Sequence, residues 1–144
     1  MEQHLRVLTL GVRDVERSRG FYVDGLGWPL ALHVPGEVAF VQIGHGLLLS
    51  LWAIEQMVAE AGEVSAAAPP LTLAHNVASE AEVAAFLERA AQAGATLLKP
   101  AELREWGGVS GYFADPDGFV WEVAHNPGLR TDADGNVSIG AIEG

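Results

Sequence analysis

The sequence contains no cysteine and a single lysine, Lys99. The lack of cysteine excludes disulfide bonds, zinc–thiolate sites, iron–sulfur clusters and thiol nucleophiles. Lys and Arg together number 8 against 19 Asp and Glu, which gives a formal net charge of −11. A surface that binds nucleic acid needs clustered basic residues, and an acidic membrane surface repels an acidic protein. We therefore expect neither kind of partner, whereas a cationic ligand would not be repelled.

Long apolar runs are also missing. No stretch approaches the length of a membrane span, and a strand pattern follows Met1 where a signal peptide would have an apolar helix. We therefore expect a cytoplasmic protein. With 144 residues, of which 49% are hydrophobic, the chain fits one compact domain with a substantial core.

Residues 5–61 predict a first module of one strand, one helix and three further strands. The first strand covers 7–12, and Asp14 caps a helix that ends near 25–27. Further elements are three strands and a short helix, predicted at 28–33, 38–43, 47–52 and 54–61. Residues 62–70 are small and turn-prone, which is typical of a linker.

Residues 71–126 predict a second module with the same order of elements. After a strand at 71–77, Ser79 and Glu82 form a capping box for a helix that Gly94 ends. Strands follow at 95–98, 109–114 and 119–125, and an offset of 65 residues superposes the two halves. The tail, 127–144, predicts either a small hairpin around residues 134–135 or a loose segment.

Each module is too small to bury its own sheet face. The pattern therefore predicts an α+β fold in which two βαβββ modules form one curved mixed sheet. Helices are expected on the convex face, and a ligand on the concave face of this cup.

Two segments carry a resemblance to a known family: LGVRDVERSRGFY at 10–22 and YFADPDGFVWEV at 112–123. Together with the paired βαβββ pattern they resemble the vicinal oxygen chelate superfamily, which includes glyoxalase I, extradiol dioxygenases and bleomycin-resistance proteins. The resemblance covers residues 5–126. It is strong for the fold and weak for the function.

The resemblance implies a divalent metal held at four positions, two in each module. In this chain those positions are occupied by Val7, Ser50, Thr72 and Glu122, and only Glu122 matches the family's ligands. Divalent transition metals prefer imidazole or carboxylate ligands. We therefore expect a degenerate metal site, with a divalent metal as a candidate cofactor but no metal ligands assigned.

Strand alternation places His75 and His125 on the opposite face from Glu122. We expect these histidines to bond to the backbone or to each other behind the sheet; the alternative is a shifted metal site of His75, Glu122 and His125. Glu122 itself has two interpretations. It is either a catalytic carboxylate with a raised pKa in an apolar pocket, or a structural one bonded to Ser50, Thr9 or Thr72.

The candidate ligand-binding residues are those that alternation turns toward the cup. Trp52 shares a face with Ser50, whereas Trp121 is expected in the core. Trp106 lies in a glycine-rich loop, where it serves either as an aromatic lid or as a plug. The full predicted set is Thr9, Ser50, Trp52, Thr72, Asn76 and Trp106.

Three functional hypotheses follow. The first is a protein similar to the bleomycin-resistance branch, which has lost the metal ligands and binds a small aromatic or cationic molecule. The second is a lyase, isomerase or dioxygenase of the glyoxalase type that uses Glu122 with a remodelled metal site. The third is an accessory protein whose cup is filled by side chains. The resemblance also implies a homodimer, since many family members are dimeric.

Overall fold

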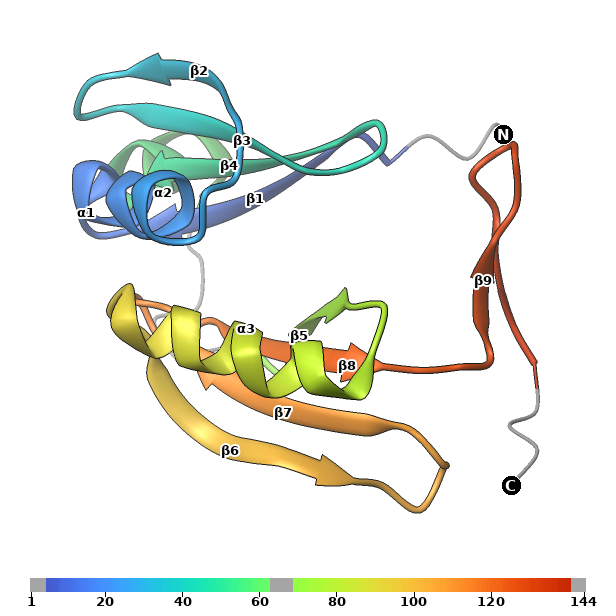
Figure 1. Ribbon diagram of the computed structural model, residues 1–144. Helices are drawn as coiled ribbons and strands as arrows, with labels where there is room; N and C mark the ends of the chain where they lie inside the picture. The colour runs from blue at the N-terminus through green and yellow to red at the C-terminus, as the bar shows by residue number, and fades with distance from the viewer. Residues whose placement is uncertain (1–4, 63–68, 141–144) are drawn as a thin grey trace. The chain divides into compact units, whose positions relative to one another are not determined.

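The computed structural model describes residues 5–62 and 69–140, which form two compact units, Met1–Pro69 and Pro70–Gly144. Figure 1 shows the elements of each unit. Within the described residues, no helix is both long enough and apolar enough to cross a membrane. Residues 63–68, in the middle of the predicted linker, lie outside the described residues.

The first unit is a four-stranded mixed sheet with helical segments. Its strands follow the order β1-β4-β3-β2, with β1 parallel to β4 and the other pairs antiparallel. The elements are β1 (Val7–Val12), α1 (Val15–Arg19), the π-helical turn η1 (Gly20–Gly25), β2 (Leu30–Val34), β3 (Val38–Gly44), β4 (Leu47–Ala53) and α2 (Ile54–Ala61).

The second unit repeats this topology. Its strands follow the order β5-β8-β7-β6, with β5 parallel to β8. The elements are β5 (Thr72–Asn76), α3 (Glu80–Gln92), β6 (Thr96–Leu103), β7 (Val109–Ala114) and β8 (Val120–His125). The identical strand order and parallel pairing confirm the predicted α+β fold of two βαβββ modules.

One face of each sheet is covered by helix and forms a core. In the first unit, Val12 and Leu51 are fully buried together with Tyr22 of η1. In the second unit α3 lies along the sheet (Figure 1), and its Val83 and Leu87 are buried there. Trp121 is 3% exposed, which confirms its predicted place in the core.

Local capping signals produce the predicted helix starts. The Asp14 side chain accepts a hydrogen bond from Arg17 N at 3.0 Å. At α3, Ser79 Oγ accepts from Glu82 N while the Glu82 carboxylate accepts from Ser79 N, so the capping box is present in full.

Two elements differ from the prediction. The first helix was expected to be continuous, but a π-helical turn begins at Gly20 and brings the consecutive Phe21 and Tyr22 into the core, 3% and 0% exposed. β6 was expected to end at residue 98, but it continues past Pro100 with shifts of register. A proline is tolerated there because β6 is an edge strand.

The position of α2 also differs from the expectation that the helices cover one face. Gly11 shares its side of β1 with Thr9, and the nearest side chains above it are Ile54 and Met57 of α2. α2 therefore lies on the face opposite to the buried Leu10 and covers one end of it.

The tail contains the predicted hairpin: β9 (Leu129–Thr131) pairs antiparallel with β10 (Val137–Ile139). Asp132 Oδ1 accepts hydrogen bonds from the backbone N–H groups of Asp134 and Asn136, each at 2.9 Å. The Asn136 N–H, followed by the Asn136 side-chain amide, which donates to Asp132 Oδ2 at 3.2 Å, lowers the pKa of Asp132. The hairpin, rather than a loose segment, is the correct alternative.

Candidate functional site

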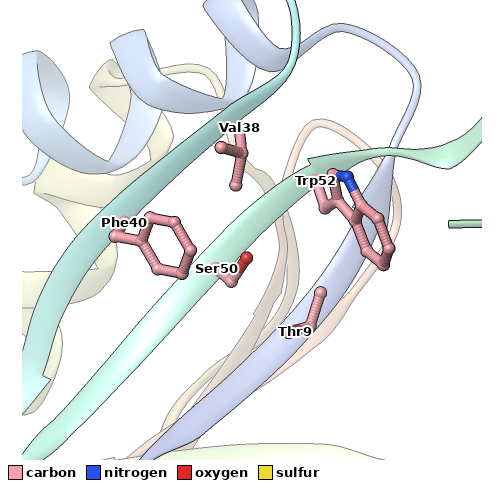
Figure 2. A pocket seen from close by; sticks show the side chains of 5 residues that line it. All are labelled: Thr9, Val38, Phe40, Ser50 and Trp52. Carbon is pink, nitrogen blue, oxygen red and sulfur yellow. The ribbon is translucent and has the colours of Figure 1, made fainter. Parts of the chain in front are cut away.

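The face of the first sheet that lies opposite to its buried core carries a pocket of about 270 Å³. We call it the open face of the first sheet. The register sets Thr9 and Phe40 on either side of Ser50 and sets Val38 beside Trp52, so side chains from three strands converge. Figure 2 shows them around one hollow. The pocket is lined by Thr9, Val38, Phe40, Ser50 and Trp52.

The pocket combines apolar walls with two hydroxyl groups. Trp52 Nε1 donates to Gln56 Oε1 of α2 at 3.1 Å. This bond holds the polar edge of the indole against a residue that does not line the pocket. Ser50 is 4% exposed at the floor. No lining side chain is charged. Such a site can hold a flat apolar group and orient one polar atom of a ligand.

Three of the predicted ligand residues, Thr9, Ser50 and Trp52, are therefore brought together. Sequence reasoning missed Val38 and Phe40. The signal was present in the predicted strand at 38–43, because alternation puts both residues on one side of it. That strand was not assigned to a neighbour, and its pairing with β4 is what places these side chains at the pocket.

The second sheet also has an open face, opposite to the one that α3 covers. In the register of β5 with β8, Thr72, Ala74 and Asn76 stand opposite Val120, Glu122 and Ala124, respectively. Tyr112 of β7 is the other neighbour of Glu122. The predicted residues Thr72, Asn76 and Glu122 therefore share this open face. No hydrogen bond or ion pair joins the Glu122 carboxylate to another described residue of this unit.

The histidines of the second unit lie on the helix-covered side, as predicted. The His75 ring packs against Phe86 of α3, with centroids 4.5 Å apart. Burial lowers the pKa of His75, which favours its neutral form. His125 Nδ1 lies 3.2 Å from the carbonyl oxygen of Val77. Within residues 5–62 and 69–140, no three His, Asp or Glu side chains gather as metal ligands.

Trp106 lies in the turn between β6 and β7 and is 45% exposed. Its ring covers Gly108, where a Cβ would collide with the indole and with the carbonyl oxygen of His125. One face of the Trp106 ring therefore packs on the turn itself, and the rest of the side chain is exposed to solvent.

The sequence of residues 4–123 matches the family model of the Glyoxalase/Bleomycin resistance protein/Dioxygenase superfamily. The chain belongs to this superfamily. A glyoxalase-related enzyme from Fulvimarina pelagi is similar in structure, with 41% identity, a TM-score of 0.88, and 97% of this chain and 100% of that chain covered.

More distant solved structures share the fold. A glyoxalase/bleomycin resistance protein/dioxygenase from Nocardioides has 27% identity and a TM-score of 0.71, covering 87% of this chain and 84% of its own. Lactoylglutathione lyase from Agrobacterium tumefaciens has 21% identity and a TM-score of 0.64, covering 86% and 94%. No curated protein sequence matches this chain.

The superfamily resemblance implies a divalent metal, and the residues at the four implied positions do not fit one. In the first sheet these positions are Val7, whose side chain has no donor atom, and Ser50, a hydroxyl at the pocket floor. In the second sheet they are Thr72 and Glu122, which provide one carboxylate. A tight transition-metal site takes three or four imidazole, thiolate or carboxylate ligands, so this donor set is too poor.

Proposed function

We propose that this superfamily member binds a small aromatic or cationic molecule on its open sheet faces, without metal chemistry of the superfamily type. The observation that carries the proposal is the first-sheet pocket, which Phe40, Val38 and Trp52 line together with Thr9 and Ser50. An aromatic pair contributes about 0.5–1.5 kcal/mol beyond its area burial.

A positive charge on the ligand is compatible with the same pocket. Cations are attracted to the faces of Trp and Phe rings. The formal net charge of −11 adds a long-range attraction for cations, which weakens as salt is added.

The ligand pocket is tested by titrating the protein with aromatic ammonium compounds and their neutral isosteres, followed by calorimetry and Trp fluorescence. Phe40→Ala removes a pocket wall and is expected to lower affinity about tenfold, since it removes both aromatic contact and apolar area. Ile139→Ala is the control, because Ile139 is 72% exposed on β10 of the other unit and is not in the lining set. Equal affinity of the Phe40→Ala and Ile139→Ala proteins would contradict the pocket assignment.

A second candidate function is a lyase, isomerase or dioxygenase of the glyoxalase type with Glu122 as general base. The observation that favours it is the place of Glu122 on an open sheet face, without a hydrogen-bond or ion-pair partner among the described residues of its own unit. A carboxylate in such a position can accept a proton from a bound substrate.

Metal content separates the two candidates. The untagged protein is titrated with Mn²⁺, Fe²⁺, Ni²⁺ and Zn²⁺ and analysed for bound elements. The binding proposal predicts no stoichiometric uptake and no turnover. Near-stoichiometric metal that is lost in Glu122→Gln would refute it and favour the enzyme.

We also propose a homodimer in the cytoplasm, as the resemblance and the sequence pattern imply. Light scattering coupled to size-exclusion chromatography tests the dimer across a range of protein concentrations. A molar mass equal to the 15.2 kDa of one chain at every concentration would refute it.

A further inference from the structure

Arg104, to which the sequence analysis gave no role, extends over the open face of the second sheet. The residue follows directly after β6. Its Nε donates to Ser110 Oγ at 2.8 Å, and its Nη2 donates to the Ser110 carbonyl oxygen at 3.0 Å. Ser110 is on the same side of β7 as Tyr112, two residues away. The guanidinium is therefore held above the face that carries Glu122.

The guanidinium is oriented by these bonds without being saturated. An arginine side chain has five N–H donors. Ser110 takes two of them, and Glu102 takes one through Nη1 at 3.2 Å. The other two donors have no partner among the described residues. The Arg104 side chain is 26% exposed, so a ligand can reach them.

An aromatic ring lies beside Arg104, and that ring has a carboxylate and the exposed Lys99 as its cross-strand neighbours. Its guanidinium carbon lies 5.8 Å from the centroid of the Tyr112 ring. Tyr112 stands opposite Glu122 in the register of β7 with β8. One open face therefore places a fixed cation, an aromatic ring and a carboxylate on adjacent positions.

The contacts of Arg104 also have a structural interpretation, in which the side chain fastens the β6–β7 turn to β7. The bonds to Ser110 alone would serve that purpose. The ion pair with Glu102 adds little, because the Glu102 side chain is 54% exposed and solvent screens it. What the structural role leaves unexplained is the placement of a cation with two further donors beside Tyr112.

We propose that the open face of the second sheet recognises a small aromatic molecule that carries a carboxylate group. Arg104 donates to the ligand carboxylate, for which a planar guanidinium is the matching partner. The Tyr112 ring contacts the aromatic group, and Glu122 accepts a hydrogen bond from an ammonium or hydroxyl group of the ligand. The proposal goes beyond the first-sheet pocket and uses none of its residues.

Three probes that differ by one group test the proposal by calorimetry: L-phenylalanine, phenylalaninamide and 3-phenylpropanoate. The amide lacks the carboxylate, and 3-phenylpropanoate lacks the ammonium group. The unaltered protein is expected to bind phenylalanine about tenfold more tightly than phenylalaninamide, because the charge-assisted bond to Arg104 is lost in the amide.

Arg104→Gln is expected to bring this affinity ratio to about one, whereas Arg130→Gln keeps it. Arg130 is an exposed cation on β9 of the same unit, away from β7 and β8 in the register, so the same substitution there changes the net charge equally. Arg104→Lys keeps the charge without the planar fork and is expected to give an intermediate ratio. This variant answers the question if Arg104→Gln does not fold. Glu122→Gln is expected to reduce the preference for phenylalanine over 3-phenylpropanoate.

The proposal is overturned if the unaltered protein shows no preference for the carboxylate, or if the ratio survives in both Arg104 variants. In that case Arg104 only fastens the turn. Because the readout is a ratio, it is insensitive to changes that weaken all probes equally. A failure of the first-sheet pocket is seen separately, as an affinity that Phe40→Ala does not alter.

Discussion

Gly111 of β7 packs so closely that a single added methyl group is expected to destabilise the second unit. A Cβ at this position would meet Leu87 Cδ1 of α3, and would lie 3.0 Å from Lys99 O and 3.1 Å from Ala101 N. The latter two are backbone atoms of β6, which pairs with β7. The neighbouring strand would have to move, whereas a side-chain end could simply rotate.

Gly11 of β1 is the matched comparison. A Cβ there would also meet atoms closely, but they are Ile54 Cδ1 and, at 3.0 Å, Met57 Sδ. Both are ends of flexible side chains on α2, neither of which is fully buried. These ends can rotate away with little change in the backbone.

The expected magnitudes follow from two opposing terms. Overpacking costs about 1–3 kcal/mol, and the upper end applies where backbone must shift. Replacing glycine by alanine returns about 0.4–1 kcal/mol by reducing the entropy of the unfolded chain. Gly111→Ala is therefore expected to lower the free energy of unfolding by about 2 kcal/mol, and Gly11→Ala by less than about 0.5 kcal/mol.

Urea unfolding followed by circular dichroism measures both free energies. Amide hydrogen exchange assigns the change to β6 and β7 or to β1 and β4, since the two glycines lie in different units. A Gly111→Ala protein as stable as the parent would refute the reasoning. So would a Gly11→Ala protein that is the less stable of the two.

Two further predictions concern side chains that bond to backbone N–H groups. Ser79→Ala removes the acceptor for Glu82 N and is expected to lower the free energy of unfolding in urea by about 1 kcal/mol. Ser79→Thr is expected to retain most of the stability. An unchanged urea midpoint in Ser79→Ala would mean that the cap does not support α3. Hydrogen bonds from the Gly36 N–H and, second, from the His33 ring lower the pKa of Glu16. The stability that this carboxylate contributes is therefore present above its unfolded pKa and is lost as the pH falls through the lower folded pKa. Glu16→Gln is therefore expected to have a lower Tm than the parent at pH 7. The difference should shrink as the pH falls below the unfolded pKa of about 4.3, and vanish once the pH is below the lowered folded pKa, where the carboxylate is protonated in both states. A Tm difference that persists at that pH would show that Glu16 acts by packing.

Features that depend on neighbours in the sequence could be predicted without the structure. Asp14 and Ser79 mark helix starts because each bonds a backbone N–H three residues on. Asp115 likewise closes its turn through the N–H groups of Asp117 and Phe119, both at 2.9 Å. The repeated order of such local signals was sufficient for the α+β fold and its two modules.

The composition of the pocket required the order of the strands. Alternation alone placed Thr9, Ser50 and Trp52 on one side of their strands. Val38 and Phe40 join them because β3 pairs with β4, a choice that sheet topology makes and that residue spacing does not encode. The same topology places Glu122 beside Tyr112.

The sequence by itself determined the class of fold, the caps, the turns and the face of each strand on which a residue lies, because hydrogen bonds and alternation act over a few residues. The tertiary structure alone decided that α2 covers Gly11, that a π-helical turn buries both Phe21 and Tyr22, and that Arg104 extends across its sheet. These outcomes depend on which distant side chains compete for the same space, and no local pattern contains that information.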